Sequence, residues 1–256
     1  MNAYLRLFRL PNLIIIVFTM CLFRYCIVFP QLFNAGIEPA LSHFDFFMLV
    51  LATVLVSAAG YTINDYFDLR IDRINKPHKQ IVGKHISRRK AILLHSVLSA
   101  LALLIGIYLS YKVRNFQSAF IFFVVALLLW LYSVRYKRKF LIGNVIISIL
   151  SSFVIVVVWV FDYYAIIAQS GDYKNLGIIF TYMQVYAFFA FFLTIIREII
   201  KDIQDIKGDI KVGCRTIPIV IGVRTTKRLL IVLNVIMILF VGYFQIILLK
   251  MEMDII

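Results

Sequence analysis

Charged residues are scarce in this sequence of 256 residues, and acidic ones are the scarcest. Asp and Glu number 13 against 27 Lys and Arg, and the four types together make up only 16% of the chain, while apolar residues make up 62%. A chain of this length cannot bury so large an apolar fraction in the core of a water-soluble domain. A soluble globular fold is therefore excluded.

Cysteine and proline are also rare, with three and five residues. Cys21, Cys26 and Cys214 lack the spacing of a metal site, so we assign them no chemical role and expect the first two to pack or to face lipid. Pro30 is the only proline inside a long apolar run. Because transporters place their sites on pairs of broken helices near the bilayer midplane, a single proline argues against a transporter.

Seven long apolar runs dominate the sequence instead. A run of about 20 apolar residues spans a bilayer, and in lipid the backbone must satisfy its own hydrogen bonds, so each run is expected to be a helix. We therefore predict an all-α bundle of seven transmembrane helices without a soluble domain. The predicted spans are Leu13–Phe33, Phe46–Ile63, Ala91–Tyr111, Phe116–Val134, Leu141–Phe161, Ile178–Ile196 and Leu229–Leu249.

The net charge of +14 is unevenly distributed among the connections. Residues 64–90, 135–140 and 197–228 carry eight, four and eight Lys or Arg, whereas every other connection carries at most two. By the positive-inside rule, this alternation places the N-terminus in the cytoplasm, which excludes a seven-helix receptor. We assign the basic excess to topology and to anionic membrane lipids, and we expect no nucleic-acid partner.

Two acidic motifs follow the second and sixth predicted spans. Both read D-x-x-D-x-x-x-D, a spacing that keeps three carboxylates within about 60° of one another on a helix. We therefore expect each motif to be a one-sided stack of carboxylates that continues a transmembrane helix. The motifs are Asn64, Asp65, Asp68 and Asp72 and, 137 residues after Asp65, Asp202, Asp205 and Asp209.

The segments after the two motifs also match, which indicates an internal repeat. Ser87 opens the third span and Thr225 opens the seventh, so both are predicted to cap helices. We expect two similar halves, each contributing one acidic helix to a shared cavity. The motifs are offset by four helices, so a complete second half would need an eighth span.

The chemistry expected of such motifs is cation binding. Like carboxylates stacked on one helix face repel each other, and a bound cation removes that cost. Mg²⁺ prefers a few carboxylates together with phosphate oxygens of a substrate, and it would neutralise a diphosphate as a leaving group. The competing interpretation is a solvated acidic face, which does not explain two copies at the ends of membrane helices.

At these residues the sequence resembles the UbiA-type intramembrane prenyltransferases. That family's first motif, N-D-x-x-D-x-x-x-D, is reproduced in full, and its second is followed here by Gly213, Thr216 and Pro218 in the pattern G-x-x-T-x-P. A third signature, Tyr-Ser-x-x-x-Lys, runs from Tyr132 to Lys137. The resemblance implies that Mg²⁺ and a prenyl diphosphate bind in a central cavity between the two acidic helices, with the isoprenoid tail directed to the bilayer.

The resemblance also implies roles for individual residues. The metal ligands would be Asn64, Asp65, Asp68, Asp72, Asp202, Asp205 and Asp209. The residues required for catalysis would be Asp65, Asp68, Asp202 and Asp205. The diphosphate contacts would be Arg73, Lys76, Tyr132, Lys137 and Lys201. The channel for the prenyl tail would be lined by Tyr182, Phe188, Phe189 and Phe192.

The acceptor is left open between two branches of the family. The segments 8–12 and 197–202 are most similar to enzymes that prenylate geranylgeranylglycerol phosphate, and the alternative is the aromatic-acid branch of quinone biosynthesis. A membrane transporter remains the alternative of another class. The family has nine spans, so we interpret residues 1–256 as one UbiA-like domain of the cytoplasmic membrane that lacks the last two helices, with its active site on the cytoplasmic side.

The predicted orientation can be tested by cysteine labelling in intact cells. Cysteines introduced at Ala35 and Asp172 should react with a membrane-impermeant maleimide from outside. Cysteines at Lys79 and Lys207 should react only after permeabilisation, because they lie in basic connections. A parent protein without the three native cysteines is the unlabelled control. The reverse labelling pattern would contradict the orientation.

Overall fold

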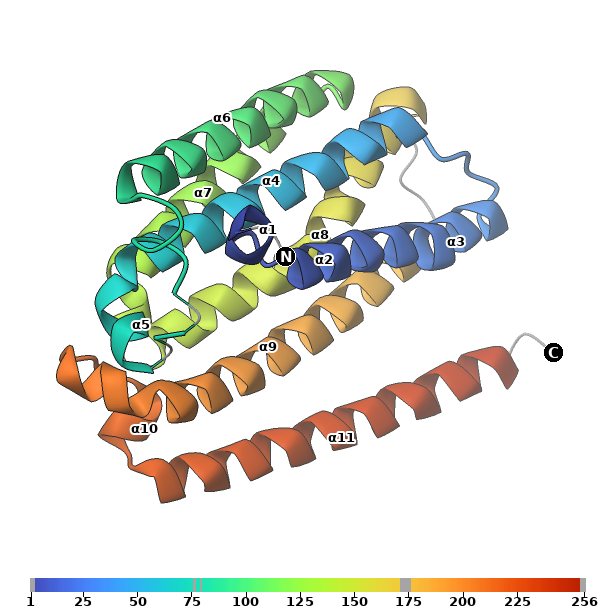
Figure 1. Cartoon of the computed structure of the whole chain (residues 1–256). Helices are drawn as coiled ribbons and strands as arrows, with labels where there is room; N and C mark the ends of the chain where they lie inside the picture. Colours follow the sequence, from blue (N-terminus) through green and yellow to red (C-terminus); the bar gives the residue numbers. More distant parts are fainter. Residues whose placement is uncertain (1–2, 76, 79, 171–175, 254–256) are drawn as a thin grey trace.

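The computed structural model describes residues 3–75, 77–78, 80–170 and 176–253, and most of them are helical. Within these residues, seven helical segments are long and apolar enough to cross a membrane, in agreement with the seven predicted spans (Figure 1). They are Leu10–Asn34, α4 (His43–Phe67), α6 (Arg88–Lys112), Phe116–Val134, α8 (Ile142–Ser170), α9 (Gly177–Lys211) and α11 (Val223–Met253).

The first span is built from three helical pieces. These are α2 (Leu10–Leu22), the π-helix η1 (Phe23–Val28) and α3 (Phe29–Asn34). Pro30 lies in the first turn of α3. A proline has no N–H group and its ring collides with the carbonyl four residues earlier, and a widened π turn relieves that collision. The proline therefore locally widens the first span without ending it.

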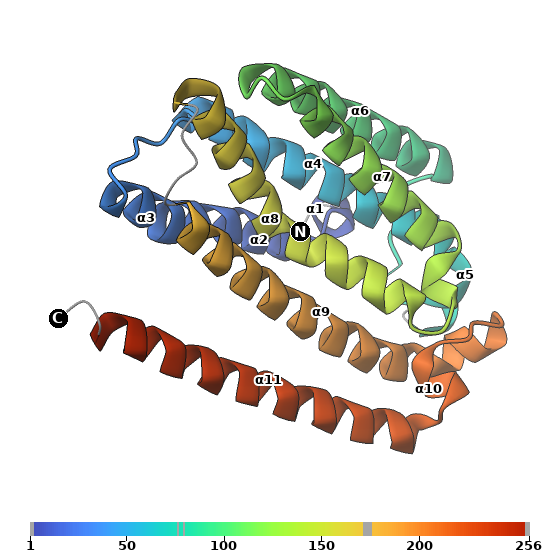
Figure 2. The ribbon, with the colours of Figure 1, turned by 180° about the vertical axis from the view of Figure 1, so that it is seen from behind.

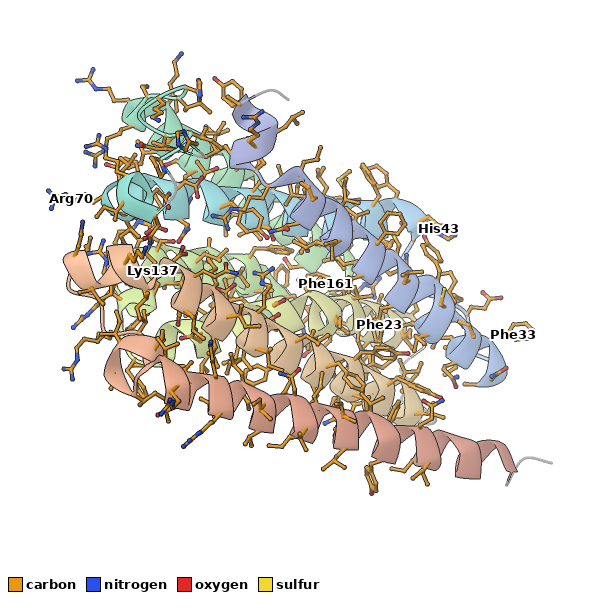
Figure 3. The ribbon with its side chains drawn as sticks, turned by 60° about the horizontal axis from the view of Figure 1, so that its bottom comes forward. Phe23, Phe33, His43, Arg70, Lys137 and Phe161 are labelled. Atoms are coloured by element: carbon orange, nitrogen blue, oxygen red, sulfur yellow. The ribbon has the colours of Figure 1, made fainter. Side chains whose placement is uncertain are left out.

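Short helices gather at one end of the bundle. They are α5 (Leu69–Asn75), the 3-10 helix η3 (Tyr136–Arg138) and α10 (Ile217–Val220). Figures 1 and 2 both place α5 and α10 at the same end, which we call the motif end. Figure 3 shows Arg70 and Lys137 there, and Phe33 and His43 at the opposite end. The basic connections of the first and second halves thus share one end of the bundle, as the charge pattern predicted.

Helix α4 lies inside the bundle and packs against α6 and α7, while α8 packs against α9. Small residues allow close helix contacts in membrane proteins, and α4 buries Ala52, Ala58, Ala59 and Gly60. A Cβ atom added to Gly60 would lie 2.9 Å from Leu129 Cδ1 on α7 (Ala119–Val134). The last helix, α11, contacts α9 and α10 and otherwise stands apart (Figure 2).

One of the two predicted helix caps is confirmed. The Ser87 side chain accepts a hydrogen bond from the Lys90 N–H at 3.3 Å and caps α6. The prediction for Thr225 is wrong, because α11 already begins at Val223 and Thr225 lies in its first turn. The repeat is offset by about two residues at this place, so the position that corresponds to Ser87 falls inside the helix.

The fifth span is longer than its apolar run. Helix α8 continues from the predicted end at Phe161 to Ser170, which places Asp162 within the membrane-spanning segment. The carboxylate of Asp162 accepts hydrogen bonds from Nε and Nη2 of Arg24, each at 3.1 Å. Arg24 lies inside the first predicted span, and its partner Asp162 lies just beyond the apolar run that predicts the fifth.

The Arg24–Asp162 pair is fully enclosed at the opposite end of the bundle from the motifs. Arg24 and Asp162 are both 0% exposed. The guanidinium also donates to the carbonyl oxygen of Leu41 and lies 4.3 Å from the ring centroid of Phe46. A charge in an apolar interior is tolerated when it is paired and hydrogen-bonded. The pair thus joins the first span, the following connection and α8.

Removing the charge of Asp162 should destabilise the bundle. Asp162→Asn keeps the shape of the side chain but leaves the Arg24 guanidinium buried without a counter-charge, which typically costs about 3 kcal/mol or more of unfolding free energy. Reversible unfolding in mixed micelles would measure this loss. The double variant Arg24→Met/Asp162→Leu removes both charges and should regain most of it. An unchanged unfolding free energy in Asp162→Asn would contradict the proposed contribution of the pair.

Candidate functional site

The first acidic motif spans the junction between two helices. Asn64 and Asp65 lie in the last turn of α4, Asp68 is its C-cap, and Asp72 lies on α5. The prediction of one continuous helix is therefore wrong at Asp68. Backbone hydrogen bonds still cross the junction, because the Asp72 N–H donates to the Asp68 carbonyl at 2.8 Å. The bend lies where α5 turns to pack against α9, a contact that spacing along one helix cannot predict.

The second acidic motif lies on one uninterrupted helix, as predicted. Helix α9 carries Asp202, Asp205 and Asp209 and ends only at Lys211. All three carboxylates line the same cavity as the first motif. Two motifs that are far apart in the sequence thus meet at the motif end of the bundle.

This polar cavity has a volume of about 630 Å³. Its lining includes all seven residues of the two motifs together with Tyr132 and Cys214. Glu198 adds a seventh carboxylate to the six motif aspartates, and they are opposed by five basic side chains, Arg6, Arg9, Lys137, Arg138 and Lys201. The cavity therefore brings together seven of the 13 acidic residues of the chain and five basic ones.

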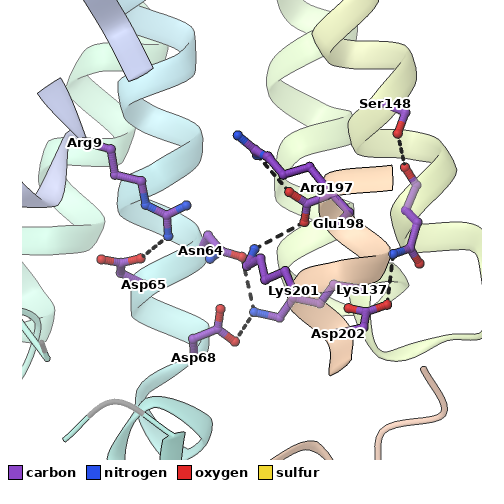
Figure 4. A network of polar contacts seen from close by, with 11 residues as sticks. Arg9, Asn64, Asp65, Asp68, Lys137, Ser148, Arg197, Glu198, Lys201 and Asp202 are labelled. Carbon is purple, nitrogen blue, oxygen red and sulfur yellow. Dashed lines mark hydrogen bonds and ion pairs between the residues drawn. The ribbon is translucent and has the colours of Figure 1, made fainter. Parts of the chain in front are cut away.

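The carboxylates of the first motif are paired with basic side chains from other elements (Figure 4). Arg9 Nη2 lies 2.9 Å from Asp65 Oδ1. Lys137 Nζ forms an ion pair with Asp68 and donates to Asn64 Oδ1 at 3.3 Å. Burial lowers the pKa of the Lys137 ammonium below its ordinary value, and the charge of Asp68 opposes that shift. Asn64 and Asp68, which lie four residues apart and therefore on the same helix face, thus share one cation.

On the second motif's side, neutral and basic groups hold the carboxylates. Asn144 Nδ2 donates to Asp202 Oδ2 at 2.9 Å. Glu198, one turn before Asp202, is paired with Arg197 at 2.8 Å and with Lys201 at 3.2 Å. Figure 4 shows the side chains from α4 and from α9 facing each other across the cavity. The two motifs are therefore opposed surfaces rather than one merged cluster.

The thiol that lines the cavity is not suited to covalent chemistry. Burial raises the pKa of Cys214 to about 11, with the nearby carboxylate of Asp209 adding to the shift. A thiol with this pKa stays protonated at neutral pH, and only the thiolate is a strong nucleophile. The carboxylates and cations are the groups that dominate the polar lining of the cavity.

The donor atoms fit a hard divalent cation that shares its ligands with a substrate. Among the described residues, no three His, Cys, Asp or Glu side chains lie close enough together to form a closed metal site. Mg²⁺ uses one or two carboxylates and completes its shell with water and phosphate oxygens. The carboxylate and amide oxygens of the two motifs, which face each other across the cavity, meet this requirement, whereas a site for Zn²⁺ would need nitrogen or sulfur ligands.

A second, smaller cavity of about 180 Å³ continues the polar one between the helices, and we call it the inner chamber. The two cavities share five lining residues, Arg9, Asn64, Tyr132, Glu198 and Lys201. Beyond them the lining becomes largely apolar, with contributions from α2, α4, α7, α8 and α9. Its apolar side chains are Ile15, Ile16, Val125, Leu129, Ile147, Leu150 and Val154.

Some of the residues singled out in the sequence lie elsewhere. Arg73 is exposed and lines neither cavity, and Lys76 lies outside the described residues. Tyr182, Phe188, Phe189 and Phe192 are absent from both linings. Phe188 packs instead against Phe240 of α11, with 4.2 Å between the ring centroids. Sequence position alone could not distinguish the cavity face of α9 from the face that packs on α11.

Other residues of the site were missed. Arg9 adopts a left-handed backbone conformation (φ 54°) between α1 (Ala3–Leu7) and α2, a conformation that is rare for a residue with a side chain and favours a functional role. Nothing in the sequence indicates that conformation. Glu198 could have been found, because it lies four residues before Asp202 and therefore on the same helix face. Nothing in the sequence indicated that Asn144 belongs to the site, because it is a single amide residue after a basic connection.

Comparison with known proteins gives a consistent picture. The profile of the UbiA prenyltransferase family matches residues 12–251. A digeranylgeranylglyceryl phosphate synthase of Methanosphaera stadtmanae is 32% identical over 186 residues, which are 73% of this chain and 61% of that protein. A protein of the same name from Methanothermobacter thermautotrophicus is 32% identical over 226 residues, covering 88% of this chain and 68% of the relative. The chain thus spans about six-tenths to two-thirds of these relatives.

Solved structures share the arrangement of the helices. A structure of digeranylgeranylglyceryl phosphate synthase superposes with a TM-score of 0.61 and 26% identity over 93% of this chain and 75% of that one. A UbiA homologue from Archaeoglobus fulgidus, solved with DMAPP and Mg²⁺, has a TM-score of 0.59 and 22% identity over 94% of this chain and 77% of that one. The second likeness shows the fold alone.

Proposed function

This chain belongs to the UbiA prenyltransferase family, and on that premise we propose that it transfers a prenyl group from a prenyl diphosphate to a lipid acceptor. Geranylgeranyl diphosphate is the proposed donor, and geranylgeranylglycerol phosphate is the proposed acceptor. The relatives named digeranylgeranylglyceryl phosphate synthase support this choice over an aromatic-acid acceptor.

The observation that carries the proposal is that the two cavities adjoin. The polar cavity, with its carboxylates and cations, lies next to the inner chamber, and five residues line both. A prenyl diphosphate has the same division, with a charged head and an apolar tail. The shared lining around Tyr132 and Lys201 is where the bond between head and tail would lie.

The motif residues would hold Mg²⁺ against the diphosphate. A bound Mg²⁺ would supply positive charge that stabilises the leaving diphosphate. We propose Asp65, Asp68, Asp202 and Asp205 as the residues required for catalysis, and the full ligand set is Asn64, Asp65, Asp68, Asp72, Asp202, Asp205 and Asp209. All of them line the polar cavity.

The cations now paired with these carboxylates would bind the remaining phosphate oxygens. Lys137 and Lys201 are held by Asp68 and Glu198 through ion pairs at the cavity wall. Both ammonium groups line the polar cavity, so they would lie beside a bound diphosphate and could donate hydrogen bonds to its oxygens. In the proposed reaction, the C–O bond of the donor would break with its electron pair leaving on the diphosphate. The acceptor hydroxyl oxygen would bond to the allylic carbon, and the hydroxyl proton would pass to water.

The tail would lie in the inner chamber among side chains of α2, α7 and α8. This modifies the expectation for Phe188, Phe189 and Phe192, which lie on α9 toward α11 and could contact only a tail that extends beyond the chamber. The acceptor lipid would approach from the bilayer. The motif end would face the cytoplasm of a cell membrane, because the basic connections gather there.

The proposal predicts a loss of turnover without a loss of folding. Asp68→Ala and Asp205→Ala each remove an anionic ligand, so turnover with geranylgeranyl diphosphate and Mg²⁺ should fall on the order of 100-fold or more. Without ligand, Asp205→Ala should melt no lower than the parent, whereas Asp68→Ala should melt lower because it leaves the largely buried Lys137 ammonium without its counter-charge. Added Mg²⁺–diphosphate should no longer stabilise either variant. Turnover is measured by product assays with glycerol-phosphate and aromatic-acid acceptors, with and without a chelator. Melting temperatures are measured with and without added Mg²⁺–diphosphate. Near-parental turnover in both variants, or undiminished turnover in excess chelator, would contradict the proposal.

The proposal also predicts where tail length is set. Ser151 on α8 lines the inner chamber, and Ser151→Phe would fill part of it. The preference for geranylgeranyl over dimethylallyl diphosphate should fall by at least about 10-fold, because the longer tail loses its space. Ile149→Phe, at a 48% exposed position on the same helix, is the matched control and should leave the preference unchanged. Equal preferences in the parent and in Ser151→Phe would place the tail elsewhere.

A further inference from the structure

One side chain after the first motif is bonded to the backbone of the second. Asn75 is the last residue of α5, and its Nδ2 donates to the carbonyl oxygen of Asp205 at 2.8 Å. Its Oδ1 accepts from the N–H of Gly208, also at 2.8 Å. These two backbone groups lie on α9 between Asp205 and Asp209, so the amide of Asn75 contacts the part of the helix that carries the second motif.

The geometry of this contact explains why position 75 is an asparagine and position 208 a glycine. An asparagine side chain has one NH₂ donor group and one carbonyl acceptor, which match a backbone carbonyl and a backbone N–H. A Cβ atom on Gly208 would lie 2.5 Å from Asn75 Nδ2. Only glycine therefore allows this approach, although a glycine inside a helix costs about 1 kcal/mol relative to alanine.

The contact bears on the site because α5 is joined to α4 through a bend. Asp68 ends α4, and Asp72 lies beyond the bend on α5, three residues before Asn75. The direction of α5, and with it the place of the Asp72 carboxylate, depends on what α5 packs against. The helix that it packs against is α9.

We propose that Asn75 is a positioning residue that clamps α5 to α9 and so sets the separation between the carboxylates of the two motifs. Its effect on binding rests on the proposed function, whereas the clamp itself is a property of the fold. Asn75 does not line the polar cavity, so it acts through Asp72 and Asp205. Loss of a residue that orients metal ligands typically weakens binding by about 10- to 100-fold.

The clamp can be measured without any ligand. Spin labels on cysteines at Arg73 and Lys207, two exposed positions on α5 and α9, report the distance between the helices in a background without the native cysteines. We expect a narrow distance distribution in the parent and a broad or shifted one in Asn75→Ala. Asn234→Ala, on the exposed face of α11, is the matched control. Equal distributions in the parent and in Asn75→Ala would overturn the clamp.

The effect on the site is read from binding and kinetics. In Asn75→Ala, the concentration of Mg²⁺–pyrophosphate that gives half-maximal thermal stabilisation, and the KM for the prenyl diphosphate, should rise on the order of 10-fold. A merely structural role would lower the amount of folded protein and leave both values unchanged, and that result would overturn the positioning role.

A double variant tests the contact itself. Gly208→Ala should weaken binding as Asn75→Ala does, because the new methyl group displaces the amide. Asn75→Ala/Gly208→Ala should be no weaker than either single variant, since the methyl group then has room. If the binding affinity of the double variant fell by the product of the two single losses, the two residues would act separately, and that result would overturn the proposal. A parent that neither binds Mg²⁺–pyrophosphate nor forms product would refute the proposed function, and the spin-label distances would still decide the clamp.

Discussion

The gathering of like charges at the motif end is the constraint on which the rest of the site depends. Seven carboxylates line one cavity, and without partners they would repel one another. Three of them have partners from elements outside the two motifs: Asp65 pairs with Arg9 from the junction of α1 and α2, Asp68 with Lys137 from η3, and Asp202 with Asn144 from α8. Glu198 pairs with Arg197 and Lys201 of its own helix, α9. The resting site is therefore a set of ion pairs and hydrogen bonds across helices, which a cation and a diphosphate can replace by new pairs of the same kinds.

The bundle has three zones along its length, which differ in polarity and in exposure to water. The motif end holds the paired carboxylates, the middle holds the largely apolar inner chamber, and the opposite end holds the enclosed pair of Arg24 and Asp162. The ion pairs of the first zone are partly exposed. The last has no access to water and satisfies its charges inside the protein. This order of zones suits a substrate whose charged head and apolar tail must be held on one axis.

Much of the fold could be predicted because it follows from local rules. Apolar runs of bilayer length must be helical in lipid, and all seven were found in the right places. Their ends were less predictable: α8 continues beyond Phe161, and α11 starts before Thr225. Polar residues at a helix end do not stop a helix when they find partners, as Asp162 does with Arg24. A hydropathy pattern identifies the apolar part of a span. It does not identify the turns beyond that part in which polar residues are paired with other helices.

The sequence by itself determined the helices, the two acidic motifs and the basic connections around them, because each is a matter of composition and of spacing along one helix. Only the tertiary structure decided how these parts meet. It turned α5 at Asp68 toward α9, brought Arg9 and Lys137 to the carboxylates, and directed the phenylalanines of α9 toward α11. The physical reason is that a helix has several faces of similar composition in a membrane protein. Which face turns inward is set by hydrogen bonds and packing between helices far apart in the sequence.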